Sequence, residues 1–403
     1  MESSREKCGL IGGKNMNLDF PILKKNNIHY FDYGATSFMP QSVIDKWCEV
    51  NSNIGVFVGR GNSILTKRAE KELKDDEKYF NKFFNISNEY QKIYTKNVTE
   101  AINIVALAIE DLIGVMDMIV VGPFEHHSNY LIWREIAKRK KAIFCEMPIN
   151  EQGSVDYDFL DRYKERIKVV SVSAVSNSFG YKMDIGKIAS KINEKTILLV
   201  DESQVVAHMP IEVNEKVSGY FIPSHKMYGP KNIAMACIKK SLINEMKPVI
   251  LGGGMVENVG YKTEWLENNK KFYAGTMDIA LISAWVEACK FIERITYEEI
   301  QKRNDKYSKI IRETLQKNGY KIIEVKKYCV NYIISFTHSN IHAHDINEYL
   351  SSKNIIIRSG NLCSQNALRK IESNALNRIT LGLGVSDDDV KCLCDELRRI
   401  VKC

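Results

Sequence analysis

The sequence predicts an α/β protein, and three observations lead to this fold class. Three short runs of apolar and β-branched residues indicate buried strands, at 116–122, 169–175 and 196–201. Helical periodicity occurs before and between them, at 98–113, 129–141 and 185–195. This alternation is typical of βαβ units, which form a largely parallel sheet with helices on both faces. In such sheets the ligand site lies at the carboxyl ends of the strands.

The pattern changes after about residue 280. A long helical stretch at 279–319 is followed by strand-like runs at 320–326 and 331–337 and by a closing amphipathic helix within 390–403. That mixture indicates a smaller α+β domain. We therefore expect an N-terminal arm at 1–20, a large domain at 21–285 and a small C-terminal domain at 286–403.

Composition indicates a folded, water-soluble protein. The 403 residues can bury a substantial core, and 44% are apolar and 27% charged. The net charge of +7 comes from 57 basic residues scattered among 50 acidic ones, which favours a solvated surface over a nucleic-acid site. No apolar run is long enough for a membrane span, and the N-terminus lacks the apolar core of a signal peptide. We expect a cytoplasmic protein with neither a nucleic-acid nor a membrane partner.

The ten cysteines show no regular spacing and no C-x-x-C pair, which argues against a disulfide framework and against a metal site of the structural zinc type. Cys392 and Cys394 lie in the predicted closing helix, where residues two apart face different ways. Cys403 is terminal, so it could react without being functional. Most of the other thiols should be reduced and inert.

Two residues suggest a cofactor site. Lys226 stands between a histidine and a Gly-Pro turn in 223–232, and it is either a surface lysine or a reactive amine. Asp201 ends a strongly apolar strand, where a carboxylate could hold the ring nitrogen of a cofactor protonated. The alternative is that Asp201 caps a following helix.

Three further positions suggest ligand binding or catalysis. Val98 and Thr99 begin a helix directly after a strand, which suits a phosphate, although Thr99 could be a plain N-cap. His126 follows another strand and could stack on an aromatic ring, shuttle protons or be structural. Cys363, in "RSGNLCSQ", is either a working thiol or a buried inert one.

Together these motifs make the chain resemble fold-type I pyridoxal-phosphate (PLP) enzymes of the class V aminotransferase group. Within that group it is most similar to the group II (SUF-type) cysteine desulfurases and selenocysteine lyases. The resemblance covers nearly the whole chain, through "HYFDYGATSFMPQSVID", "RGNSILTKRAE", "NVTEAINIVA", "EHHSNYLIW", "VSAVSNSFG", "VDESQVVAHMPIEV", "SHKMYGPKNIAM", "LGGGMVENV", "YAGTMD", "RSGNLCSQ" and "NRITLGLG". It implies a large domain with a mostly parallel seven-stranded sheet and a smaller C-terminal α+β domain.

The resemblance also implies roles for individual residues. Lys226 would bind PLP covalently and remove the substrate's Cα proton, Asp201 would pair with the pyridinium nitrogen, and His126 would stack on the ring. Contacts to the cofactor or substrate would come from Gln204 and Asn177, and contacts to the phosphate from Val98, Thr99, His225 and, from a second subunit, Thr276. Arg378 would clamp the substrate carboxylate, with Arg358 as a helper. The Thr276 contact implies a homodimer.

The activity so implied is cysteine desulfuration. L-cysteine becomes L-alanine, and its sulfur forms a persulfide on Cys363 for iron–sulfur clusters or a related pathway, through a sulfur-acceptor protein. Thiolate character at Cys363 would be favoured by Arg358, the cofactor and an exposed loop. The alternatives are a PLP lyase or sulfurase acting on selenocysteine, cysteine sulfoxide or molybdenum cofactor, an epimerase, or a silent sulfur-relay scaffold.

The chain departs from the family pattern at four places. Asn361 and Leu362 replace a histidine pair, and Pro223-Ser224 replaces serine-glycine before His225. Gly384-Val385-Ser386 replaces tyrosine-asparagine-threonine, and "AGTMD" replaces "AGTPN". All four touch the substrate or phosphate side, so the substrate is a weaker prediction than the cofactor.

Overall fold

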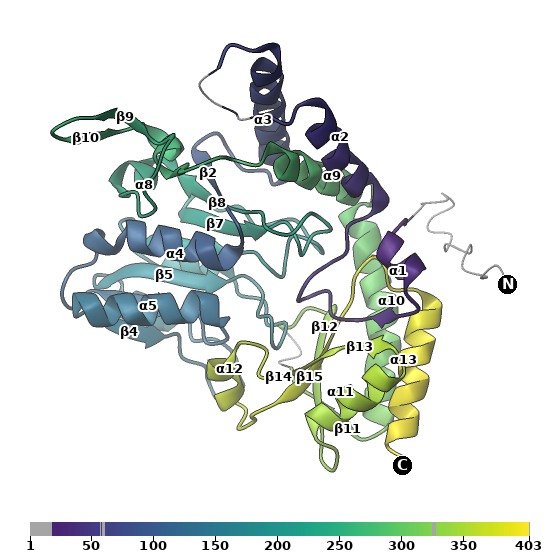
Figure 1. Ribbon diagram of the computed structural model, residues 1–403. Coiled ribbons are helices and arrows are strands. Elements are labelled where there is room, and N and C mark those ends of the chain that lie inside the picture. The colour runs from purple at the N-terminus through teal and green to yellow at the C-terminus, as the bar shows by residue number, and fades with distance from the viewer. Residues whose placement is uncertain (1–17, 57, 59–60, 325–327, 403) are drawn as a thin grey trace.

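A seven-stranded sheet forms the centre of the computed structural model, which describes residues 18–56, 58, 61–324 and 328–402 (Figure 1). The strand order is β2-β8-β7-β6-β5-β3-β4. Their bounds are β2 Tyr90–Thr95, β3 Met118–Val121, β4 Ile143–Glu146, β5 Ile167–Ser173, β6 Ile197–Asp201, β7 Val217–Pro223 and β8 Ala234–Lys239. β8 runs antiparallel to both neighbours, while the other four pairs are parallel. The predicted α/β fold with a mostly parallel sheet is confirmed.

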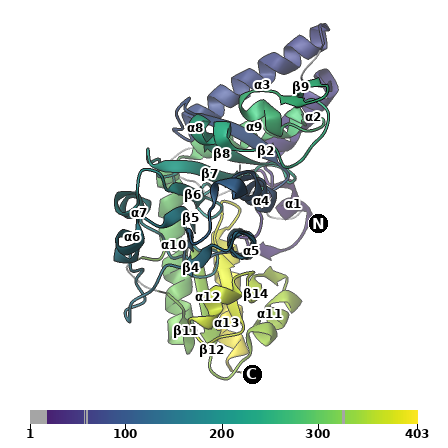
Figure 2. The ribbon, with the colours of Figure 1, turned by 90° about the vertical axis from the view of Figure 1, so that its left-hand side faces the viewer.

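Helices cover both faces of this sheet (Figure 2). α4 (Val98–Ala108) and α5 (His127–Lys140) lie on one side, and α6 (Asp158–Tyr163) and α7 (Ile185–Lys191) lie on the other. Ile102 of α4 and Trp133 of α5 are fully buried, and both belong to the same hydrophobic cluster as Val169 of the sheet. The helix predicted at 98–113 is present as α4 followed by a short 3₁₀ helix, η1 (Glu110–Leu112). The helix expected at 185–195 ends at Lys191. The peripheral α8 (Lys240–Glu245), η2 (Asn268–Phe272) and hairpin β9 (Val256–Val259) and β10 (Thr263–Trp265) follow β8.

A four-stranded antiparallel sheet forms the C-terminal part, in the order β11-β12-β15-β14. Its strands are β11 Tyr320–Ile322, β12 Ile333–His338, β14 Arg358–Gly360 and β15 Leu376–Thr380. The helices here are α10 (Tyr297–Lys317), α11 (Ala343–Ser352), α12 (Gln365–Arg369) and the closing α13 (Asp387–Ile400). The two expected strand-like runs are thus present, and residues 325–327 lie outside the described residues.

The long helical stretch expected at 279–319 is two helices, α9 (Ile279–Ile295) and α10. The break is at Thr296, whose φ of 74° is incompatible with a continuous helix, and its side chain caps α10 by accepting from Glu299 N. The single-stretch expectation was therefore wrong at this residue.

The first described residues lie beside the C-terminal part. β1 (His29–Tyr30) pairs in parallel with β13 (Ile355–Ile356), and Asp32 bridges to Thr380. Before and after them come the helices α1 (Pro21–Lys25), α2 (Gln41–Asn53) and α3 (Ile64–Phe83). The expected arm at 1–20 falls almost wholly outside the described residues, and the division at 285/286, which α9 crosses, stays a prediction.

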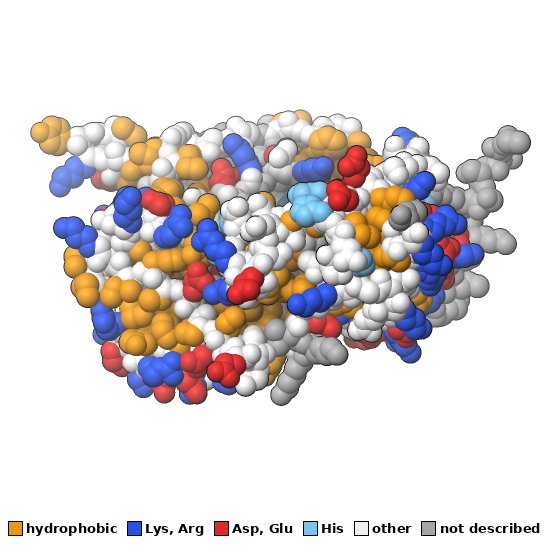
Figure 3. Space-filling model, turned by 90° about the horizontal axis from the view of Figure 1, so that it is seen from below, with side chains coloured by type: hydrophobic (Ala, Val, Ile, Leu, Met, Phe, Trp, Pro, Cys, Tyr) orange, Lys and Arg blue, Asp and Glu red, His pale blue; other side chains and the backbone are white. Residues whose placement is uncertain are grey.

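The surface carries charges of both signs. On the face in Figure 3, Lys and Arg side chains are interspersed with Asp and Glu. None of the helices in the described ranges is long and apolar enough to cross a membrane.

Among the described cysteines, Cys237, Cys289 and Cys394 are buried, whereas Cys48 and Cys363 are exposed. Burial raises the pKa of Cys237 to about 12, which makes that thiol unreactive. Cys403 lies outside the described residues.

Candidate active site

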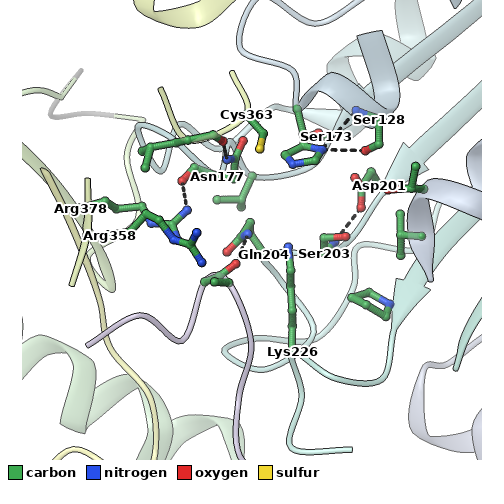
Figure 4. Close-up of a pocket in the computed structure, with 18 of the residues that line it drawn as sticks. Ser128, Ser173, Asn177, Asp201, Ser203, Gln204, Lys226, Arg358, Cys363 and Arg378 are labelled. Atoms are coloured by element: carbon green, nitrogen blue, oxygen red, sulfur yellow. Dashed lines mark hydrogen bonds between the residues drawn. The ribbon is translucent and has the colours of Figure 1, made fainter. Parts of the chain in front are cut away.

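A cavity of about 370 Å³ lies where the carboxyl ends of β5, β6 and β7 meet the C-terminal sheet (Figure 4). Ser173, Asp201 and Pro223 end the three parallel strands, and Arg358 and Arg378 approach from β14 and β15. This is the edge at which a ligand site was expected.

The cavity gathers nearly all the predicted site residues. Its lining includes Val98, Thr99, His126, Asn177, Asp201, Gln204, His225, Lys226, Arg358, Cys363 and Arg378. Thr276 is the exception, because it is exposed in the segment before α9 and does not line this cavity. Its predicted contribution to a second subunit's site stays a prediction.

Lys226 stands in the loop after β7, and its amine points to the centre of the cavity (Figure 4). The turn that presents it is closed by Met227 N and Gly229 N, which both donate to Ser224 O. Burial lowers the pKa of Lys226 to about 8, although the charge of Asp201 acts to raise it. Its amine has no hydrogen-bond or ion-pair partner within the described ranges. Lys226 is therefore a buried lysine and not a surface one. Part of its amine is neutral near pH 7.

Asp201 is buried at the end of β6. Its Oδ1 accepts from Ser203 N at 2.9 Å, and the residues that follow form turns and no helix, so the helix-cap alternative is wrong. Burial raises the pKa of Asp201, and the hydrogen bond from Ser203 and the charge of Lys226 oppose that rise. A cationic N–H donor in the cavity would stabilise this carboxylate.

His126 is the N-cap of α5. Its Nδ1 lies 2.8 Å from Ser128 Oγ and accepts from Ser128 N at 3.2 Å, which fixes the ring. Burial, with a smaller effect from Lys226, lowers the pKa of His126 to about 3. The ring is therefore neutral near pH 7 and suited to stacking on a flat ligand.

The start of α4 leaves two backbone donors available. The N-cap is Asn97, whose side chain accepts from Glu100 N at 2.9 Å, so the alternative that Thr99 is the cap is wrong. The N–H groups of Val98 and Thr99 have no partner among the residues described. Such free donors at a helix N-terminus suit a phosphate.

His225 borders the same end of the cavity. Its Nδ1 lies 3.2 Å from Thr36 Oγ1, and burial lowers the pKa of His225 to about 4. Pro223, one of the departures noted above, also lines the cavity, whereas the Ser224 hydroxyl is buried without a partner among the described residues.

The opposite end of the cavity carries two guanidinium groups. Arg378 donates from Nη2 to Asp32 Oδ1 at 2.7 Å and from Nη1 to Asn177 O at 2.8 Å. Arg358 donates from Nε to Asp32 Oδ2 at 2.9 Å. The Arg378 side chain is 4% exposed and that of Arg358 48%, so Arg378 is the fixed member of the pair. Asp32 was missed at the sequence level, although it lies in the quoted motif at 29–45.

The side chains of Asn177 and Gln204 form hydrogen bonds with neighbouring loops. Asn177 donates from Nδ2 to Leu362 O and accepts at Oδ1 from Ser364 Oγ, both at 2.8 Å. Gln204 donates from Nε2 to Gly34 O at 2.9 Å. Their predicted contacts to a cofactor or substrate stay predictions.

Cys363 lies on an exposed loop between β14 and α12, at the edge of the cavity. Leu362 and Cys363 have successive positive φ angles of 52° and 54°, a strained conformation for residues other than glycine. The loop is held by Cys363 O, which accepts from His127 N at 2.8 Å, and by Asn361 Oδ1, which accepts from Cys363 N at 3.1 Å. The Cys363 side chain is therefore exposed and not buried, and its role as a working thiol stays a prediction.

Known proteins resemble this chain over its full length. It matches the family model described as Aminotransferase class-V over residues 29–393. A probable cysteine desulfurase of Halalkalibacterium halodurans is 30% identical over 394 residues, covering 94% of this chain and 96% of that protein. One of Pyrococcus abyssi is 29% identical over 397 residues, covering 95% and 96%.

Solved structures show the same fold. The apo structure of a cysteine desulfurase from Thermococcus onnurineus NA1 matches with a TM-score of 0.89 at 25% identity, covering 98% of this chain and 99% of that one. An Escherichia coli cysteine desulfurase in an S-sulfonic acid form matches with a TM-score of 0.86 at 22% identity, covering 95% and 97%.

Proposed function

The chain belongs to the class-V aminotransferase family, and from that premise we propose that it is a PLP-dependent cysteine desulfurase of the group II (SUF-type). It would convert L-cysteine to L-alanine and move the sulfur onto Cys363. The observation that carries the proposal is one cavity that holds three groups. They are the amine of Lys226, which has no partner in the described part of the chain, the guanidinium of Arg378, which can bind a carboxylate, and an exposed thiol at the edge.

PLP fits the groups that the cavity offers. Lys226 has no partner among the described residues and can bind a carbonyl carbon, and Asp201 can hold a protonated ring nitrogen. Val98 and Thr99 present N–H groups that no described residue accepts from and that a phosphate would satisfy. The neutral ring of His126 can stack on the pyridine. When bound, PLP supplies an electron sink that stabilises negative charge at the substrate's Cα.

The residues of the chain supply binding and proton transfer. Arg378 binds the substrate carboxylate through guanidinium N–H groups that Asp32 and Asn177 leave unused. Lys226, with its pKa near 8, can take the Cα proton near neutral pH and return a proton later.

Cys363 receives the sulfur. In the transfer the bond between the substrate's Cβ and its sulfur breaks, and a sulfur–sulfur bond to Cys363 forms. The electron pair of the broken bond stays with Cβ, which takes up a proton. Cysteine is thereby reduced to alanine while the Cys363 thiol is oxidised to a persulfide. A thiol of an acceptor protein then removes the outer sulfur and regenerates Cys363.

Three further predictions belong to this proposal. The enzyme works as a homodimer in which Thr276 reaches the partner's phosphate. Its sulfur goes to an acceptor protein for iron–sulfur clusters or a related pathway. It acts in the cytoplasm.

The experiment is an assay of the purified, PLP-loaded protein with L-cysteine, L-selenocysteine and cysteine sulfoxide. Alanine, pyruvate and the persulfide on Cys363 are scored together. The proposal predicts alanine from L-cysteine, lost in Lys226→Ala and strongly reduced in Cys363→Ser. Cys48→Ser is the matched control, because Cys48 is also exposed but lies on α2.

Two results would contradict the proposal. Full desulfuration of L-cysteine by Cys363→Ser would remove the thiol from the reaction. A preference for cysteine sulfoxide with pyruvate as the product would favour the lyase alternative.

A further inference from the structure

His127 directly follows the histidine that caps α5, and the proposed function gives it no role. Its side chain is half-buried and does not line the cavity. Its ring centroid lies 6.3 Å from that of His126, and the two ring planes are tilted by 43°, so the rings are not stacked. His127 therefore lies outside the surface that would touch a cofactor or a substrate.

Both the backbone and the side chain of His127 bind the loop that carries Cys363. The backbone N–H donates to Cys363 O at 2.8 Å. The ring Nε2 accepts from Gln365 N at 3.2 Å. One residue of α5 thus holds the loop at two points, at Cys363 itself and two residues later.

The side-chain contact replaces a missing helix cap. Gln365 is the first residue of α12, and the preceding Ser364 makes no side-chain cap hydrogen bond. Its hydroxyl donates instead to Asn177 Oδ1 at 2.8 Å. The first N–H groups of a helix have no acceptor within the helix, and His127 Nε2 supplies one for Gln365.

The loop depends on such contacts from outside. Leu362 and Cys363 both have positive φ angles, a conformation that persists only where the surroundings enforce it. Asn177 binds the loop at Leu362 O and at Ser364 Oγ. His127 binds it at the residue between these two and at the residue after them. The four contacts therefore alternate along the loop between two anchoring residues.

The contact to Gln365 requires a neutral His127 ring. A neutral histidine accepts on one ring nitrogen, whereas a protonated one donates from both. Because Gln365 N is a donor, Nε2 must be the nitrogen without a hydrogen. Burial lowers the pKa of His127, which favours this neutral form.

We propose that His127 is a positioning residue for Cys363: by accepting from Gln365, its side chain fixes the loop so that the thiol stays where it can receive sulfur. The inference rests on the proposed function in that Cys363 is the sulfur acceptor. His127 touches neither end of the cavity. Its loss should therefore slow sulfur transfer and leave substrate binding unchanged.

The hold on the loop is measured by backbone amide hydrogen exchange in cofactor-free protein. His127→Ala removes the acceptor, so exchange at Gln365 should accelerate about fivefold or more. His127→Gln places an amide oxygen close to the position of Nε2 and should return the rate to within about twofold of the wild type. His338→Ala is the matched control, because His338 also accepts a backbone N–H, from Asn340 at 3.2 Å, but at the end of β12.

Sulfur transfer is measured in a single turnover of PLP-loaded protein with L-cysteine, with alanine and the persulfide on Cys363 counted together. In His127→Ala the maximal rate should fall about fivefold or more. The L-cysteine concentration that gives half of this rate should change less than about twofold. His127→Gln should recover the rate. A merely structural role predicts instead that both variants lose rate alike, or that the half-maximal concentration shifts with the rate.

Three results would overturn the inference. They are exchange at Gln365 within about twofold of the wild type in His127→Ala, an unchanged rate of alanine formation in that variant, and a loss of rate that His127→Gln does not recover. Wild-type protein that forms no alanine would contradict the proposed function, and the exchange rates would still decide whether His127 holds the loop. If His127→Ala does not fold, His127→Leu carries the same predictions, because leucine fills the space without an acceptor.

Discussion

The rate at which Lys226 captures PLP should depend on pH in a way that reports its buried environment. Burial lowers the pKa of Lys226 from 10.5 to about 8. Near pH 7 an amine of pKa about 8 is roughly one-tenth neutral, whereas an ordinary lysine is neutral in roughly one molecule in 3,000. Near pH 7 the neutral, reactive fraction of Lys226 should therefore be roughly 300 times that of an exposed lysine.

The assay mixes cofactor-free protein with PLP and follows the visible absorbance of the lysine-bound form from about pH 6 to about pH 10. The rate should rise about tenfold per pH unit, bend near pH 8 and then level off. Asp201→Asn should move the bend to lower pH, because the Asp201 charge stabilises the protonated amine. Lys226→Ala should abolish the signal, and Lys262→Ala, at an exposed lysine, should not. A rate that still rises without a bend at about pH 10 would refute the reasoning.

Three other perturbations test the site and its support. Asn177→Ala removes two hydrogen bonds of about 1 kcal/mol each from the Cys363 loop. Backbone amide hydrogen exchange at 361–364 should therefore accelerate about tenfold or more. Unchanged exchange would show that Asn177 does not hold the loop. In Arg378→Lys the lysine cannot bind both Asp32 and a substrate carboxylate. The KM for L-cysteine should therefore rise about tenfold or more. An unchanged KM would exclude Arg378 from substrate binding. Burial raises the pKa of Glu202 to about 8, so this carboxyl keeps its proton in the folded state over a pH range in which the unfolded state loses it. The free energy of unfolding should therefore fall by more than about 1 kcal/mol from about pH 5 to pH 8. Glu202→Gln should flatten that slope in urea titrations, and an equal slope in both proteins would contradict this.

Local patterns predicted the elements that carry the site. The apolar runs that became β3 and β6 and the helix start at Val98 depend on neighbouring residues, and the structure places them close to the expected positions. Two misjudged positions had local signals as well. Asn97 stands three residues before Glu100, and Thr296 three before Glu299, which is the usual spacing between a helix cap and an acidic residue.

Long-range contacts explain what local patterns missed. Asp32 and Arg378 are 346 residues apart in the chain, and their contact exists only because β1 and β13 pair and Asp32 bridges to Thr380. No spacing rule connects such positions. The replacement of a histidine pair by Asn361 and Leu362 is similar. Only the structure shows that Asn361 accepts from the backbone of Cys363 and that the Leu362 carbonyl accepts from Asn177.

The central claim is that Cys363 accepts sulfur from a substrate bound at Lys226. The most direct measurement is mass spectrometry of the Cys363 peptide after one turnover with L-cysteine labelled at sulfur, with alanine counted in parallel. The account predicts one labelled sulfur on Cys363 for each alanine formed, and neither product in Lys226→Ala. Alanine without label on Cys363, or label on Cys363 without alanine, would contradict it.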